Sequence, residues 1–228
     1  MRKMLLIAGT LVVLAAFTGG AKASTLTVYS GGDNSVSSLS QMTNSVVAET
    51  AFAAAAPGLN VITFESGVPS GVTISGGSVT NNSGCGSLCG FNTTPGGSYF
   101  YVLDGGTATF DFTTPIDALG MYITGLQTNL VPQETITFSD GSSETIDTPS
   151  AINGGGAFVG FTDIGASIVS VSYNATNDAV SLDDVQYGSV TVTTPEPGTL
   201  SMILMGLVAL GLLVGMKGYR GNRLAAEV

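Results

Sequence analysis

The stretch from Ser24 to Thr194 contains no Lys, Arg or His, and this sets the firmest limit on how it can fold. All six basic residues lie outside it, at Arg2, Lys3, Lys22, Lys217, Arg220 and Arg223. Of the 16 carboxylates, all but Glu196 and Glu227 lie within it, so its charge near neutral pH is about −14. No side-chain salt bridge can form there. Binding to nucleic acid or to an anionic membrane by charge needs a cationic patch and is excluded. Cations, neutral polysaccharides and uncharged surfaces remain as partners.

Short alternating apolar segments separated by turn residues indicate a β-rich domain. We predict strands at 25–29, 61–64, 71–74, 99–103, 107–113, 118–126, 135–138, 144–146, 157–161, 168–173 and 180–187, with a further edge strand at 190–193. Asp140-Gly141 predicts a hairpin between two of them. One helix is expected near Ser40 to Ala56, with Met42, Val46, Val47, Ala51, Phe52 and Ala55 on its apolar face. The pattern favours an all-β sandwich or jelly roll with one N-terminal helix.

Two cysteines, Cys85 and Cys89, lie in a glycine-rich segment. If the chain leaves the cytoplasm, as its N-terminus indicates below, an even pair predicts a disulfide, which would restrain a local turn. A metal site is the competing interpretation, but further Cys or His ligands are lacking.

The N-terminus has the features of a secretory signal peptide. Arg2 and Lys3 form the positive start, Met4 to Phe17 the apolar stretch, and Ala21-Lys22-Ala23 a small-x-small site. A permanent anchor is disfavoured, because a spanning helix needs about 20 apolar residues. We predict that residues 1–23 are removed by cleavage between Ala23 and Ser24, and that residues 24–194 form one exported domain.

The C-terminal segment 195–228 combines three elements in order. Pro195-Glu196-Pro197 is followed by an uncharged apolar run at 200–216 and then by Lys217, Arg220 and Arg223. We predict a transmembrane helix at 200–216, with these three basic side chains on the cytoplasmic side. An ordinary anchor helix behind a proline-rich stalk is the alternative.

This arrangement resembles the PEP-CTERM sorting signal of Gram-negative bacteria. The resemblance implies recognition of Pro195, Glu196 and Pro197 by an exosortase-type enzyme, transient anchoring in the inner membrane, and transfer to the cell envelope or extracellular matrix. It also implies a bacterium that produces exopolysaccharide and biofilm.

A second resemblance concerns three carboxylates of the exported domain. Phe64-Glu65 and Leu182-Asp183-Asp184-Val185 are similar to segments of jelly-roll carbohydrate-binding modules that meet at a structural calcium ion. The resemblance implies calcium ligands at Glu65, Asp183 and Asp184, and calcium prefers six to eight oxygen ligands. The alternative is that these carboxylates face solvent. Strand geometry sends Asp183 and Asp184 to opposite faces unless a bulge intervenes.

Carbohydrate recognition would need exposed aromatic side chains, and the chain has no Trp. The candidates are Tyr99, Tyr101, Tyr122, Tyr173 and Tyr187, although tyrosines at strand spacing more often pack in a core. Without His, Ser-His and Cys-His nucleophile systems are excluded. A carboxylate-only glycosidase is the third hypothesis. The sequence therefore favours a non-enzymatic exported matrix protein, with a calcium-stabilised carbohydrate-binding module as the alternative.

Overall fold

The computed structural model describes residues 25–130, 135–139, 143–190 and 205–207. The chain divides into two compact units, Met1–Val190 and Thr191–Val228. Both hydrophobic clusters lie in the first unit, so the predicted exported domain has its own core. Of the predicted membrane helix, only residues 205–207 are described, and they are helical. Over the described ranges, no helix is both long and apolar enough to cross a membrane.

The domain is predominantly β-structure, as the alternating pattern predicts. The strands are β1 (Thr25–Asp33), β2 (Asn60–Ile62), β3 (Val72–Ser75), β4 (Ser78–Thr80), β5 (Phe100–Ile116), β6 (Ala118–Leu126), β7 (Thr135–Ser139), β8 (Ser143–Asp147), β9 (Gly155–Ile164) and β10 (Ile168–Gly188). They form one sheet in the order β1-β9-β6-β10-β5-β3, and β2, β4, β7 and β8 pair with it off this path. Two short 3-10 helices, Leu39–Gln41 and Gly86–Cys89, lie in connecting segments. Strand β4 was not predicted.

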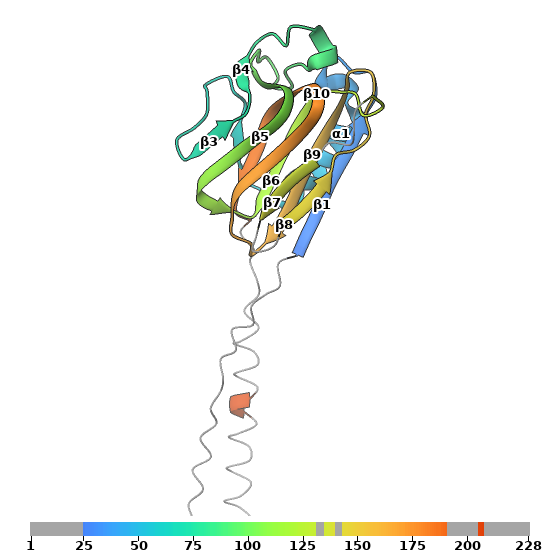
Figure 1. Cartoon of the computed structure of the whole chain (residues 1–228). Helices are drawn as coiled ribbons and strands as arrows, with labels where there is room; N and C mark the ends of the chain where they lie inside the picture. Colours follow the sequence, from blue (N-terminus) through green and yellow to red (C-terminus); the bar gives the residue numbers. More distant parts are fainter. Residues whose placement is uncertain (1–24, 131–134, 140–142, 191–204, 208–228) are drawn as a thin grey trace, which may run out of the picture. The chain divides into compact units, whose positions relative to one another are not determined.

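Strands β5 and β10 are each longer than the sequence predicts, because each continues through a segment that looked like a turn. Gly105 and Gly106 have φ angles of +74° and +76°, which only glycine adopts without strain. Opposite them, the pairing of β10 with β5 shifts register around Thr176. The two strands therefore bend together instead of ending. This bend carries the sheet from one layer into the next (Figure 1).

The bent sheet folds back on itself and encloses the main core. One half of β10 pairs with β6, and the other half pairs with β7, so both layers share this strand. Phe138 and Phe161 stack inside with ring centroids 4.2 Å apart. In β6 every residue is buried, because one face of the strand lines this core and the other lies beneath a helix.

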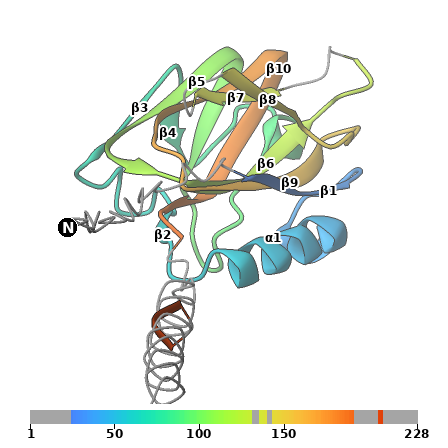
Figure 2. The same cartoon turned by 90° about the horizontal axis from the view of Figure 1, so that it is seen from below.

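Helix α1 (Thr43–Ala55) lies on the outer face of the sheet, along β1 and β9 (Figure 2). Phe52 is fully buried, and it rests where Gly120 and Gly160 face each other across β6 and β9. A Cβ atom at Gly120 would lie 2.8 Å from the Phe52 ring, so the two glycines leave the room that this ring fills. The predicted helix is confirmed.

The predicted apolar face of α1 is partly wrong. Met42 and Phe52 are buried as expected, but Val46 and Val47 are exposed. Ser45 takes a buried position instead, because its hydroxyl group donates a 2.7 Å hydrogen bond to the Asp33 carboxylate. A polar contact thus sets the rotation of the helix about its axis.

Candidate functional site

The addressing motifs lie outside the described residues. These are the signal cleavage residues Ala21, Ala23 and Ser24, the motif Pro195-Glu196-Pro197, and the basic residues Lys217, Arg220 and Arg223. The sorting and topology assignments therefore stay predictions.

The three predicted calcium ligands meet one loop, residues 91–99. Glu65 Oε1 accepts hydrogen bonds from the backbone N–H groups of Ser98 and Tyr99, at 2.6 and 2.7 Å. The Asn92 side chain donates to the same oxygen at 3.2 Å. Glu65 follows Phe64, which has a φ angle of +62° and is buried against Tyr101. This turn points Phe64 into the core and Glu65 towards the loop.

Asp183 and Asp184 hold the other part of the same loop. Asp183 Oδ2 accepts from the backbone N–H groups of Thr93 and Thr94, at 2.6 and 3.2 Å. Asp184 accepts from both threonine hydroxyl groups, at 2.8 Å for Thr93 and 2.6 Å for Thr94. We call the three carboxylates Glu65, Asp183 and Asp184 the loop anchors.

A bulge allows neighbouring aspartates to reach the same loop. The pairing of β10 with β6 shifts register between Asp183 and Gln186, and Asp184 has a φ angle of +47°. In a regular strand the two side chains would point to opposite faces. Here the Thr93 hydroxyl group lies within hydrogen-bond distance of both carboxylates. The sequence pattern identified the residues but not the bulge.

The anchoring role places Asp183 in an unusual electrostatic setting. Its side chain is 1% exposed. Burial and then the charge of Asp184 raise the pKa of Asp183 to about 7, although the N–H groups of Thr93, Asp184 and Thr94 lower it. Because no basic residue exists in this domain, neutral donors alone stabilise the charged form.

The loop anchors already accept hydrogen bonds that a calcium ion would have to replace. Asp183 Oδ2 already accepts three hydrogen bonds, and Asp183 Oδ1 accepts one from the Asp184 N–H group. Glu65 binds a different part of the loop from the two aspartates. Within the described segments, no three His, Cys, Asp or Glu side chains are grouped so as to hold a metal ion. The calcium hypothesis stays a prediction for experiment.

The cysteine pair lies just before this loop. Cys85 and Cys89 form a disulfide, with Cα atoms 5.6 Å apart. The Cys89 carbonyl group accepts a 3.0 Å hydrogen bond from the Ser181 hydroxyl group of β10. Loop 91–99 therefore starts from a restrained segment and is held along its length by the loop anchors.

The five candidate tyrosines have different roles. Tyr101, Tyr122 and Tyr173 are buried, so they belong to the core. Tyr99 is 42% exposed on the anchored loop. Tyr187 is half-buried near the end of β10, and its ring stacks on Phe112 with centroids 5.3 Å apart.

Tyr187 and Phe112 line a groove of about 420 Å³. The other residues that line it are Asn60, Pro69, Ser70, Gly71, Val72, Thr113 and Thr114. Pairing of β2 with β10 and of β3 with β5 brings these four strand ends together. We call this the Tyr187 groove. Of the residues that line the groove, the sequence pointed only to Tyr187, because no motif links segments so far apart.

The Tyr187 groove has the chemistry of a site for an uncharged ligand. It presents hydroxyl groups, one side-chain amide and two aromatic rings, and no carboxylate of the described residues lines it. The lack of a carboxylate among these lining residues contrasts with the charge of about −14 on the domain. Several carboxylates instead accept structural hydrogen bonds, as Asp33 does from Ser45 and Asp117 does from the Val190 N–H group.

Comparisons with known proteins give only weak similarities. No protein family matches the sequence, and no curated protein matches it either. Among solved structures, the chain is similar to TmCBM61, determined in complex with β-1,4-galactotriose. The identity is 15% and the TM-score 0.29, over 55% of this chain and 92% of that one.

The chain is also similar to the CBM22-1-CBM22-2 tandem domain of Xyn10C from Paenibacillus barcinonensis. The identity is 16% and the TM-score 0.41, over 64% of this chain and 49% of that one. The chain thus matches about half the length of the tandem. Both TM-scores are too low to assign a function, so the functional argument rests on the groove and the anchored loop.

Proposed function

We propose that residues 24–194 form a non-catalytic module that binds a neutral, hydroxyl-rich polymer in the Tyr187 groove. The observation that carries the proposal is the lining of this groove, which among the described residues is polar and aromatic and contains no carboxylate. Hydroxyl and amide groups exchange hydrogen bonds with a polyol, and an aromatic face packs against its apolar C–H surface. A polymer without charge also avoids repulsion by the anionic domain.

The sequence supports an exported setting for this module. A signal peptide would direct the module across the inner membrane. An exosortase-type enzyme would then process the PEP-CTERM-like segment, and the module would reach the envelope or extracellular matrix. Exopolysaccharide is the hydroxyl-rich polymer that this setting offers, and the proposal requires an uncharged one. The protein would then act as a surface or matrix component of a biofilm.

Binding can be measured by co-sedimentation of purified residues 24–194 with the host's own extracellular polysaccharide. We expect saturable binding that Tyr187→Ala weakens at least about tenfold, equivalent to roughly 1.4 kcal/mol. Tyr99→Ala is the matched control, because Tyr99 is the more exposed tyrosine and lies next to the other end of β5. No binding by the unchanged domain, or equal binding by Tyr187→Ala, would refute the groove assignment. Loss of binding only in Tyr99→Ala would move the site to the anchored loop.

The same preparation tests calcium. The loop anchors already have hydrogen-bond donors, so we expect equal melting temperatures in excess calcium and in excess chelator. A melting temperature raised by calcium and restored by the chelator would show that a calcium site exists after all.

A further inference from the structure

Asn60 and Tyr187 are neighbours in the Tyr187 groove. They lie directly opposite each other in the pairing of β2 with β10, and both line the groove. Side chains of directly opposite residues lie on the same face of a sheet, with Cβ atoms about 4.5–5.5 Å apart. The Asn60 amide therefore lies beside the tyrosine ring, where both can contact one ligand.

The tyrosine ring is restrained before any ligand arrives. It stacks on Phe112 of β5, with 5.3 Å between the ring centroids and 29° between the ring planes. A restrained side chain loses little rotational freedom on binding. Tyr187 is half-buried, so part of its ring stays open to a ligand. A sugar unit that packs against this part would have the hydroxyl groups at its rim next to Asn60.

The Asn60 amide is available to such a ligand. Its side chain is exposed, and among the residues that the structure describes no hydrogen bond engages the amide. Thr113 differs, because its hydroxyl group donates to the Gly71 carbonyl group at 3.2 Å and is part of the groove wall. A primary amide donates two hydrogen bonds and accepts two. Asn60 therefore brings unused donors and acceptors to the groove.

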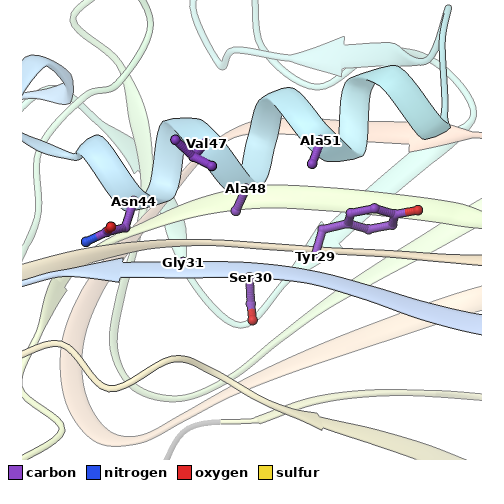
Figure 3. A pocket seen from close by; sticks show the side chains of 7 residues that line it. All are labelled: Tyr29, Ser30, Gly31, Asn44, Val47, Ala48 and Ala51. Atoms are coloured by element: carbon purple, nitrogen blue, oxygen red, sulfur yellow. The ribbon is translucent and has the colours of Figure 1, made fainter.

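A second groove, between α1 and β1, provides a contrast. It has a volume of about 400 Å³, and it also combines a tyrosine ring, Tyr29, with one amide, Asn44 (Figure 3). Here the Asn44 amide donates to the Gly32 carbonyl group at 3.2 Å and to Asp33 Oδ1 at 2.9 Å. These bonds join the start of α1 to the end of β1. The amide of this second groove is therefore committed to the fold, whereas that of the Tyr187 groove is not.

An amide selects a ligand more narrowly than a hydroxyl group does. The exposed hydroxyl groups of Ser70 and Thr114 can rotate, and each can donate or accept, so they accommodate many partners. The Asn60 amide has a fixed order, with an accepting oxygen and a donating nitrogen on the same carbon. It fits two hydroxyl groups on neighbouring carbons, one that donates to Oδ1 and one that accepts from Nδ2.

We propose that Asn60 determines specificity in the Tyr187 groove by binding two adjacent free hydroxyl groups of the sugar unit that packs against Tyr187. This inference rests on the proposed binding of a neutral polymer in that groove. It narrows the substrate class to neutral polysaccharides whose units keep a vicinal diol, that is, free hydroxyl groups on neighbouring ring carbons. Linkages or substituents that block one hydroxyl group of each pair leave the amide with a single partner.

Periodate oxidation tests this substrate class. Periodate cleaves the C–C bond between two carbons that carry adjacent free hydroxyl groups and is itself reduced to iodate. Borohydride then reduces the two aldehydes to alcohols, so the polymer stays neutral. The purified full-length protein is co-sedimented with the host's extracellular polysaccharide, either oxidised and reduced or treated with borohydride alone. We expect oxidation to weaken binding at least about tenfold, because two hydrogen bonds to Asn60 are lost. Equal binding of both preparations would overturn the inference, as would binding of a polysaccharide that consumes no periodate.

A variant separates the amide from the ring, since opening the sugar also disturbs packing on Tyr187. Asn60→Ala should weaken binding of the untreated polysaccharide about three- to tenfold. It should reduce the ratio between the two preparations by the same factor, because oxidation and the variant remove the same hydrogen bonds. Asn177→Ala is the matched control, since Asn177 is an exposed asparagine of β10 outside the groove lining. An unchanged ratio in Asn60→Ala, or an equal effect of both variants, would refute the role of Asn60.

The groove and the diol can fail separately. If the unchanged protein does not bind the untreated polysaccharide, the groove assignment fails and this inference fails with it. If Tyr187→Ala weakens binding but oxidation and Asn60→Ala do not, the groove stands and the diol is refuted. Asn60 is exposed, so Asn60→Ala should keep the melting temperature of the unchanged protein. Weaker binding by a variant with that melting temperature therefore reports on recognition.

Discussion

Asp183 shows how a single carboxylate can make the stability of this domain depend on pH. Its pKa is raised to about 7, from an ordinary value of 3.8. The folded state therefore binds a proton that the unfolded state has already lost between about pH 4 and 7. When the folded state binds more protons, stability falls as pH rises.

We predict that the free energy of unfolding decreases by about 2–3 kcal/mol between pH 5 and pH 8, as Asp183 becomes charged inside the protein. Urea unfolding of residues 24–194 at these two pH values measures it. Asp183→Asn removes the titrating group and should flatten the profile in this window. If Asp183→Asn kept the same slope, other carboxylates would be responsible.

At the level of residues, the sequence predicted which carboxylates matter but not what they contact. Glu65, Asp183 and Asp184 do converge on one loop, 91–99. Nothing in the sequence marked Thr93 and Thr94 as their hydrogen-bond partners, because any chain segment offers backbone N–H groups. The bulge at Asp184 was equally hidden, since its positive φ angle occurs at a residue other than glycine.

Among the elements, α1 depends most clearly on one side chain from outside itself. Asp33, at the end of β1, accepts hydrogen bonds from the backbone N–H groups of Asn44 and Ser45, at 3.0 and 2.9 Å. These donors lie in the first turn of the helix and have no partner within it. Burial raises the pKa of Asp33, but the hydrogen bonds from Ser45 and Asn44 lower it more, and the net shift is downward.

Asp33→Ala should therefore destabilise the domain by about 2 kcal/mol at pH 7, because it removes a charged helix cap. The loss should be largest above pH 4 and shrink as acid protonates Asp33 in the unchanged protein. Thermal unfolding followed by circular dichroism measures both effects. Asp111→Ala is the control, since the exposed Asp111 accepts from the Ser170 side chain on a neighbouring strand. An equal loss in both variants would contradict a specific role for the cap.

Element types were predictable because apolar periodicity reports them directly, as for β6, β7 and α1. The residues at which these elements end were harder to predict. Gly105 and Gly106 read as a turn, yet the chain bends there within one continuous strand. The apolar face of α1 was misassigned because Val46 and Val47 are apolar but exposed. Tertiary contacts, which local sequence does not encode, decided both cases.

For the whole molecule, the decisive prediction concerns sorting. Replacing Pro195-Glu196-Pro197 by alanines should leave the protein in the membrane fraction of its host, since an exosortase-type enzyme would no longer recognise it. Immunoblots of membrane and medium fractions measure this. Replacing Thr191-Val192-Thr193 by alanines is the matched control, with three changes immediately before the motif. Unchanged release of the Pro-Glu-Pro variant would rule out the sorting hypothesis.

The central position of β10 has a mechanical consequence. This strand pairs with β2, β5, β6 and β7, and the chain leaves it through Gly188 and Val190. A pull on the chain beyond Val190 therefore enters the domain through its most extensively bonded strand, where many hydrogen bonds share the load. A pull at Thr25 instead reaches β1, which pairs with β9 alone among the described strands and can separate from it bond by bond. The domain resists traction best from its C-terminal side.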